Sequence, residues 1–247
     1  IAFNSFDDLY ITSRESFYPY VTRITKYDSE SHIKLLYFDT SWDVSDFFID
    51  ASDDIYVMGI NSINIYDPNG YILGFIGSVE ENGEVKNGFF DRGKYPASVL
   101  NGMFGQLSSI YIDKDNTIYV TDIKKLKVIH LTKYGRIINT YDILSNFTTK
   151  DNYFASGILK YSDNRFYLAD NENDRVLVFD GSFNLINSFG KHGTNIGDFN
   201  ILKDITKDNL GYVYALDSFK MQKFYPDGTF IASFGSLGLG ENEFINA

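Results

Sequence analysis

The chain of 247 residues contains no cysteine, only four prolines and no long run of apolar residues. Without cysteine the protein forms neither disulfides nor a thiolate nucleophile, and either a reducing or an oxidising compartment suits it. The apolar runs fall well short of the roughly 18 residues that a membrane-spanning helix requires, so no transmembrane segment is expected. The scarcity of proline agrees with a chain built from many hydrogen-bonded strands.

Positive charge is also scarce, since 22 Lys and Arg residues stand against 33 Asp and Glu residues and the net charge is −11. Nucleic-acid affinity depends largely on Lys and Arg, so a nucleic-acid partner is not expected. An anionic membrane surface is disfavoured for the same reason. Lys124, Lys125 and Lys127 form a small basic cluster that does not reverse this expectation.

Aromatic residues are abundant, at 17% of the chain, and 20 glycines are spread along it. Aromatic residues favour strands and glycine favours tight turns. A tripeptide with a central tyrosine between apolar residues occurs at Leu9–Ile11, Ile55–Val57, Ile118–Val120, Phe166–Leu168 and Val213–Ala215. The copies recur about every 47 residues, with one longer interval, and a period in this range is typical of repeat architectures.

Each copy predicts a small antiparallel sheet. In the fourth copy, alternating apolar and polar residues between Asn, Asp and Gly turns predict strands at about 156–161, 165–169, 175–179 and 184–189. Four such strands cannot cover both faces of their own sheet, whereas sheets arranged radially cover one another. The sequence therefore predicts an all-β fold, a β-propeller of four-stranded antiparallel blades, with a linear β-solenoid as the alternative.

We expect a single propeller domain over residues 1–247 with five complete blades. The predicted blades lie at approximately 1–40, 43–78, 106–144, 153–190 and 201–235, with an insertion at 79–105. Residues 241–247 have two interpretations. They either dock beside the first repeat and close a five-bladed ring, or lead into a further blade of a longer, six-bladed protein.

The fourth and fifth copies share a more detailed pattern. The fourth carries Phe166–Asp170, Arg175-Val176 and Phe189-Gly190, and the fifth carries Val213–Asp217 with Phe234-Gly235. This pattern resembles that of the NHL-repeat β-propeller family, strongly over residues 106–247 and more weakly over 1–78. The resemblance implies a propeller, usually with six blades. RNA binding, which occurs in some members, is disfavoured here by the charge.

An acidic and a basic residue accompany each other in the last three copies. The acids follow the second strand and the bases precede the third, and they are Asp122 with Lys127, Asp170 with Arg175, and Asp217 with Lys220. The first two copies lack both members. We interpret the pairs as structural braces of the intervening loop, and an arginine can bond a carboxylate with two parallel hydrogen bonds. The alternative is that five surface positions vary independently.

The insertion at 79–105 is read as a long connection between blades. Loops longer than about 12–15 residues are uncommon unless they are functional or disordered. It contains Phe89, Phe90, Arg92, Tyr95 and Phe104, which we take as candidate contacts for a protein partner. The alternative is that these aromatic residues fold back and fill the central channel.

Carboxylates gather in the predicted turns between first and second strands, at Asp7, Asp8, Asp53, Asp54, Asp113, Asp115, Asp163 and Asp208. One interpretation is that these carboxylates form an acidic ring that attracts a basic partner. The other, which is favoured, is that Asp occurs at these positions because it is a common turn residue. None has the spacing of a calcium-binding loop.

An enzyme is the alternative to a binding protein. The resemblance permits a hydrolase or lyase with a metal on the propeller axis, like the peptide-amidating propellers, which use zinc held by histidines from different blades. His32, His130 and His192 fall at dissimilar places in their repeats, so a histidine-rich metal site is not expected. A carboxylate site would draw on Asn4, Asp50, Asp113 and Asp208, which share one register. We predict no catalytic residue, no metal and no cofactor.

The sequence favours a non-catalytic propeller that binds another protein, as a module of a larger assembly. Glycan binding is a further alternative because the chain is rich in tyrosine, and a small-molecule ligand is left open. The composition, rich in Asn, Asp and Tyr and without Cys, slightly favours a bacterial protein outside the cytoplasm, periplasmic or at the cell surface, although the compartment itself is not determined by the sequence.

Overall fold

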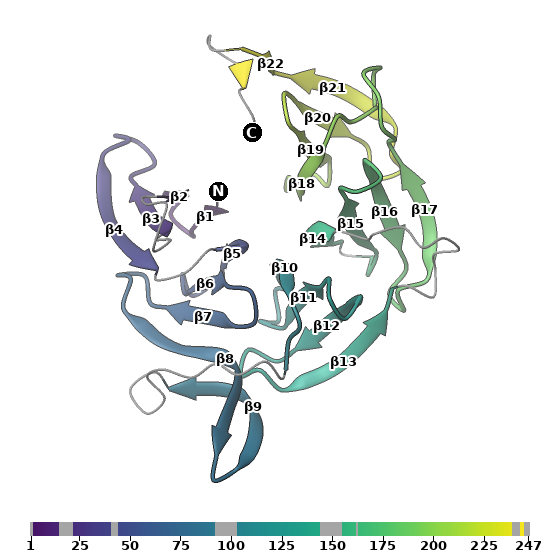
Figure 1. Ribbon diagram of the computed structural model, residues 1–247. Coiled ribbons are helices and arrows are strands. Elements are labelled where there is room, and N and C mark those ends of the chain that lie inside the picture. Colours follow the sequence, from purple (N-terminus) through teal and green to yellow (C-terminus); the bar gives the residue numbers. More distant parts are fainter. Residues whose placement is uncertain are drawn as a thin grey trace. The chain divides into compact units, whose positions relative to one another are not determined.

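The computed structural model describes residues 2–14, 22–40, 44–91, 103–143, 155–161, 163–238 and 243–244. Within these ranges the protein is all-β and contains no helix (Figure 1). It follows that none of the described segments is a helix long and apolar enough to cross a membrane. The sheets are the antiparallel blades of a β-propeller, as the repeats predict.

Five sheets follow one another along the chain, each with its strands in sequential order. The first sheet contains β1 (Ala2–Phe3), β2 (Leu9–Arg14), β3 (Thr22–Tyr27) and β4 (Lys34–Thr40). The second contains β5 (Asp46–Ile49), β6 (Ile55–Met58), β7 (Ile63–Tyr66), β8 (Ile72–Glu81) and β9 (Glu84–Asp91). The third contains β10 (Leu107–Ile112), β11 (Ile118–Asp122), β12 (Lys127–Leu131) and β13 (Ile137–Asp142).

The fourth sheet contains β14 (Ala155–Lys160), β15 (Phe166–Asp170), β16 (Arg175–Phe179) and β17 (Leu185–Phe189). The fifth contains β18 (Leu202–Lys207), β19 (Val213–Asp217), β20 (Met221–Phe224) and β21 (Phe230–Phe234). After it, β22 (Ser236–Leu237) pairs in parallel with β23 (Glu243–Phe244).

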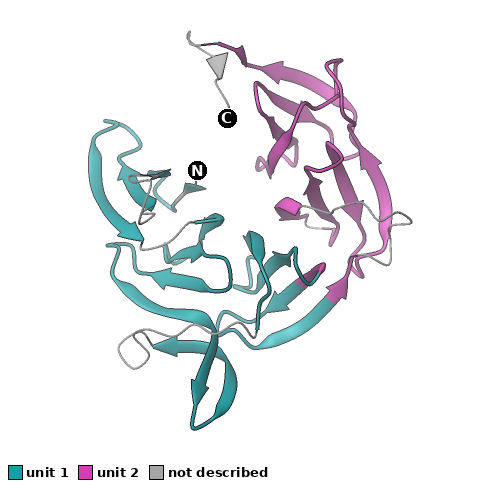
Figure 2. Ribbon diagram, in the orientation of Figure 1, with its two compact units in different colours: residues 1–125, 129–140 teal, residues 126–128, 141–247 magenta. Residues whose placement is uncertain are grey.

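The chain divides into two compact units (Figure 2). Unit 1 comprises residues 1–125 and 129–140, and unit 2 comprises residues 126–128 and 141–247. The boundary falls within the third sheet, so unit 1 contains the first two sheets and unit 2 the last two. Every contact described below lies inside one unit.

The tyrosine-centred tripeptides form the second strand of every blade, as predicted. β6, β11 and β15 are buried along their whole length, because a middle strand of a blade is covered on both faces. The outer strands β13 and β17 are largely exposed. Unit 1 has an apolar core around Met58, Ile118 and Val120, and unit 2 has one around Tyr167, Phe199 and Phe224.

The second sheet differs from the prediction because it has a fifth strand. β8 continues past the length of a normal fourth strand to Glu81, and β9 returns beside it with an unbroken register from Glu81↔Glu84 to Gly74↔Asp91. Asn82 and Gly83 make the connecting turn with φ of 56° and 81°. Two consecutive positive φ values are typical of the tight turn that suits a twisted hairpin, and Asn-Gly is its preferred pair.

The segment expected as a long loop is therefore ordered as strand over residues 79–81 and 84–91. We call β8 from Val79 onwards, together with β9, the hairpin extension; its turn points away from the other strands of unit 1 in Figure 1. Its base is held by Gly135 of the β12–β13 turn. A Cβ at this glycine would lie 2.6 Å from Ile76 Cγ2 and 2.9 Å from the carbonyl carbon of Gly88, so only glycine fits.

Candidate functional site

The described members of the candidate partner site do not share one environment. Phe89 on β9 is 37% exposed, and Phe90 beside it is half-buried, with its ring centroid 5.6 Å from that of Phe75. Phe104 is 1% exposed in the core of unit 1, so it cannot contact a partner and we leave it out of the candidate surface. Arg92 and Tyr95 lie outside the described residues.

The hairpin extension presents an exposed strand to solvent. On β9, Val85 is 58% exposed, and it lies on the same face as Asn87 and Phe89 because side chains alternate along a strand. Four-stranded blades have no strand that corresponds to β9. The exposed apolar side chains of β9 lie within the segment from which the sequence predicted a partner surface, but the sequence did not predict that they belong to a strand. The missed signal was the Asn82-Gly83 pair, which is typical of a tight hairpin turn.

The direction of the β9 backbone groups follows from one hydrogen bond. The Phe89 N–H donates to the carbonyl of Tyr134 in the β12–β13 turn, at 3.0 Å, and so points away from β8. In an antiparallel ladder the N–H and C=O of one residue share a direction, which alternates at each step. Since the β8–β9 register has no irregularity, the backbone groups of Val85 and Asn87 also point outward. We call these groups the β9 edge.

Negative charge gathers at the tip of the hairpin extension. Glu80, Glu81 and Glu84 surround the turn, and Lys86 forms an ion pair with Glu81. Among the residues that the structure describes, no ion pair is recorded for Glu80 or Glu84. The tip therefore carries an excess of carboxylates in addition to its open backbone.

The braces predicted from the sequence have different partners in each repeat. In unit 2, Arg175 Nε lies 2.7 Å from Asp170 Oδ2, and Asn173 also donates through its side chain to both oxygens of this fully buried carboxylate. A buried carboxylate with charged and neutral donors on both oxygens holds the β15–β16 loop in place.

The two lysine repeats rely on backbone amides instead. Asp122 in unit 1 accepts the N–H groups of Gly105 at 2.7 Å, Gln106 at 3.1 Å and Lys125 at 2.9 Å. It therefore fastens the segment that leads into β10 as well as its own loop. Lys127 begins β12 and is half-buried.

In the fifth sheet, Asp217 Oδ2 accepts the N–H of Asn200 at 2.8 Å, and Lys220 contributes its backbone carbonyl, which accepts the Asp217 N–H at 2.8 Å. Burial raises the pKa of the Asp217 carboxyl. An aspartate that accepts hydrogen bonds is thus common to the three loops. The donors differ: they include side chains for Asp170 and are backbone N–H groups for Asp122 and Asp217.

A carboxylate that the sequence reasoning missed joins two neighbouring sheets in unit 1. Asp46 at the start of β5 accepts the Ser109 hydroxyl at 3.1 Å and the Ile110 N–H at 3.0 Å, both from β10. Burial raises the pKa of Asp46 to about 6, although these hydrogen bonds oppose the change. No feature of the sequence distinguishes Asp46 from a surface residue before the blades are placed.

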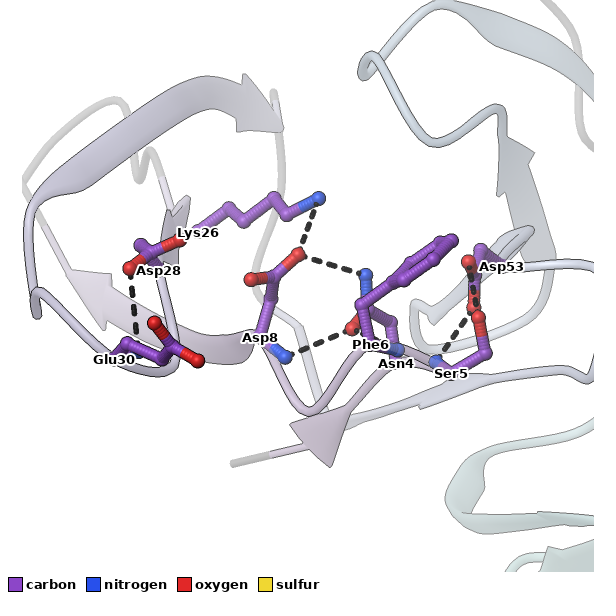
Figure 3. Close-up of polar contacts among 8 residues, drawn as sticks. All are labelled: Asn4, Ser5, Phe6, Asp8, Lys26, Asp28, Glu30 and Asp53. Carbon is purple, nitrogen blue, oxygen red and sulfur yellow. Dashed lines mark hydrogen bonds and ion pairs between the residues drawn. The ribbon is translucent and has the colours of Figure 1, made fainter.

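The acidic turns are occupied by contacts within the protein (Figure 3). Asp8 lies between Asn4, whose Nδ2 donates at 3.1 Å, and Lys26, whose Nζ is 2.8 Å away. The hydrogen bond from Lys26 holds the pKa of Asp8 below its ordinary value. Asp53 accepts the N–H of Ser5 at 2.9 Å and its hydroxyl at 2.8 Å, which ties the β1–β2 turn to the β5–β6 turn.

Three of the four residues named for a carboxylate metal site cap their own turns, and the fourth, Asp113, accepts the N–H of Lys114 at 2.8 Å. Asn4 Oδ1 accepts the N–H groups of Phe6 and Asp8, Asp50 Oδ1 those of Ser52 and Asp54, and Asp208 Oδ1 those of Leu210 and Tyr212. Acceptor oxygens used in this way are ordinary turn chemistry.

The histidines have separate contacts. His192 Nδ1 lies 2.6 Å from Asp174 Oδ2, His130 stacks on Tyr119, and His32 contacts the Glu30 carbonyl. Within the described ranges, no group of three or more His, Asp or Glu side chains is arranged to hold a metal ion.

No protein-family model matches the chain. Solved structures that resemble it include a protein of unknown function from Bacteroides thetaiotaomicron, with a TM-score of 0.68, 12% identity and coverage of 98% of this chain and 60% of that one. A streptogramin B lyase has a TM-score of 0.61 and 16% identity, covering 98% and 70%. The WD40 domain of Neurospora crassa Pan2 has a TM-score of 0.56 and 10% identity, covering 96% and 64%.

At these identities the likeness shows the fold alone. The β-propeller is thus shared with proteins of different kinds, among them a lyase and a WD40 domain. Because one fold hosts many functions, the function of this chain has to be argued from its own surface.

Proposed function

We propose that this protein is a non-catalytic propeller with NHL-type repeats, and that it binds a partner protein through the hairpin extension. The observation that carries the proposal is the fifth strand of the second sheet. Within the described residues each of the other four blades has four strands, so the extension is not needed to complete a blade.

The extension has features of a protein-binding surface. Val85 and Phe89 expose apolar area on one face of an eight-residue strand. The base of the hairpin is fixed by the Phe89–Tyr134 hydrogen bond and by the close approach at Gly135. A strand that is held rigidly before binding loses less conformational entropy when a partner docks, which favours affinity.

The proposal is tested by shortening the hairpin without altering its register. Val79 and Lys86 are paired, so replacing Glu80–Val85 with Asn-Gly leaves a two-residue turn closed by this pair. In crosslinking and affinity capture from native extract, we expect the wild type to capture a specific partner and the shortened variant to lose it.

A matched control is Tyr71→Ser, which removes an exposed aromatic side chain from the same sheet without touching the hairpin. It should capture the partner as the wild type does. Capture of the same partner by the shortened variant, with its thermal unfolding unchanged, would disprove the assignment of the surface.

A further inference from the structure

We propose that the β9 edge accepts an extended, positively charged segment of a partner protein as an additional strand. The inference depends on the proposed function and specifies the chemistry of the partner. It follows from three features of the hairpin extension: the backbone groups of the edge, the side chains beside them and the charge at the tip.

The backbone groups are arranged to pair with another strand. Val85 and Asn87 point their N–H and C=O groups away from β8, and within the described part of the chain no backbone partner is recorded for them. The neighbouring outward N–H of Phe89 already donates to a carbonyl from outside the hairpin, that of Tyr134. An exposed row of such groups is the template that strand addition uses.

The side chains define the sequence that fits. Val85 and Phe89 share one face of β9, so an incoming strand gains apolar contact there from alternate residues. Glu84 lies on the other face of β9, near the turn, whereas Glu80 lies on β8 opposite Val85 and is not adjacent to an added strand. A Lys or Arg of the added strand opposite Glu84 would be favourable, because unlike charges on adjacent strands attract.

A second copy of this chain fits the edge less well. The antiparallel register that uses the outward groups of both residues pairs Val85 of each copy with Asn87 of the other. This register places the two Lys86 side chains directly opposite each other. Like charges opposite each other destabilise a pair of strands, and two chains of net charge −11 also repel. A lysine at this position is a common protection of edge strands against self-pairing. The charge therefore favours a basic strand from a different protein.

The test uses a fluorescent peptide that alternates valine and lysine, with a control peptide in which glutamate replaces lysine. Fluorescence anisotropy with the whole chain should show saturable binding of the basic peptide and none of the acidic one. Val85→Pro removes one outward N–H without breaking a bond to β8, and it should weaken binding by about tenfold or more. Glu84→Lys should weaken it by a similar factor, whereas Glu30→Lys, an equal charge change on an exposed turn of the first sheet, should not.

Absence of binding by the basic peptide, or equal binding by wild type and Val85→Pro, would overturn the inference. So would a dimer in sedimentation that Val85→Pro converts to monomer, since the edge would then be occupied by a second copy. If the shortened hairpin loses the captured partner while Val85→Pro and Glu84→Lys retain it, strand addition is wrong and the proposed function stands.

Discussion

Replacing Asp122 with alanine is expected to lower the free energy of unfolding by about 4 kcal/mol. The carboxylate is fully buried and accepts three backbone N–H groups, from Gly105, Gln106 and Lys125. Alanine leaves these donors without their acceptor, and each buried unpaired donor costs roughly 1–3 kcal/mol. Urea unfolding monitored by circular dichroism measures the change.

The matched control is Asp115→Ala in the turn between the first two strands of the same sheet. Asp115 is exposed, and it accepts the N–H and hydroxyl of Thr117. Water can replace these bonds, so the loss should stay below about 1 kcal/mol. Similar losses for the two variants would show that Asp122 is no more than a turn residue.

The second large expected effect is a pH dependence of the free energy of unfolding, which is caused by Asp46. Its pKa is raised from an ordinary 3.8 to about 6 by burial in the folded protein. Folding therefore favours the protonated carboxyl, and the stabilisation is fully present below about pH 3.8 and is lost as the pH rises through about 6. The difference between the two pKa values corresponds to roughly 3 kcal/mol.

The measurement compares the wild type with Asp46→Asn, which removes the titration and keeps an oxygen for the Ile110 N–H. Between pH 4 and pH 7 the stability of the wild type should fall relative to the variant by up to about 3 kcal/mol. The comparison is needed because other carboxylates, such as Asp8, have lowered pKa values and act in the opposite direction. Parallel stability profiles for the two proteins would show that Asp46 does not titrate in this range.

The repeat pattern was sufficient to predict the blades. The tyrosine tripeptides form second strands, and the third strands at Ile63–Tyr66, Arg175–Phe179 and Met221–Phe224 also lie where the alternation places them. This works because a middle strand is apolar on both faces and is bounded by Asn, Asp and Gly, so local sequence and tertiary burial specify the same structure.

The hairpin extension could not be predicted in the same way, because none of the other repeats has it in the part of the chain that the structure describes. Its alternation of apolar and polar residues is weak, since Gly88 has no side chain and Phe89 and Phe90 are consecutive. The Asn82-Gly83 pair was the available signal. An Asn-Gly pair indicates a hairpin only when the segments on both sides of it can pair as strands. Here that pairing extends over the eight residues of β9, and it requires β8 to continue to Glu81.

The acid–base braces were predicted from types of side chain, and only part of that chemistry could be read from a sequence. Arg175 is paired with Asp170 in the structure, whereas Asp122 and Asp217 are bonded by backbone amides. Every residue except proline carries such an amide, so sequence gives no indication of which one a buried carboxylate will meet. The same limit explains why Asp46 was missed.

Residue-resolved amide hydrogen exchange on β9 of the free protein tests the central claim most directly. The N–H groups of Lys86 and Gly88 point to β8 and should exchange slowly. Those of Val85 and Asn87 form the β9 edge and should exchange faster by roughly a hundredfold, equal to about 2.7 kcal/mol of local opening. Slow exchange at all four positions would mean that the edge is already covered, and fast exchange at all four would mean that the hairpin is not formed. Either result would contradict a preformed edge that is open to a partner strand.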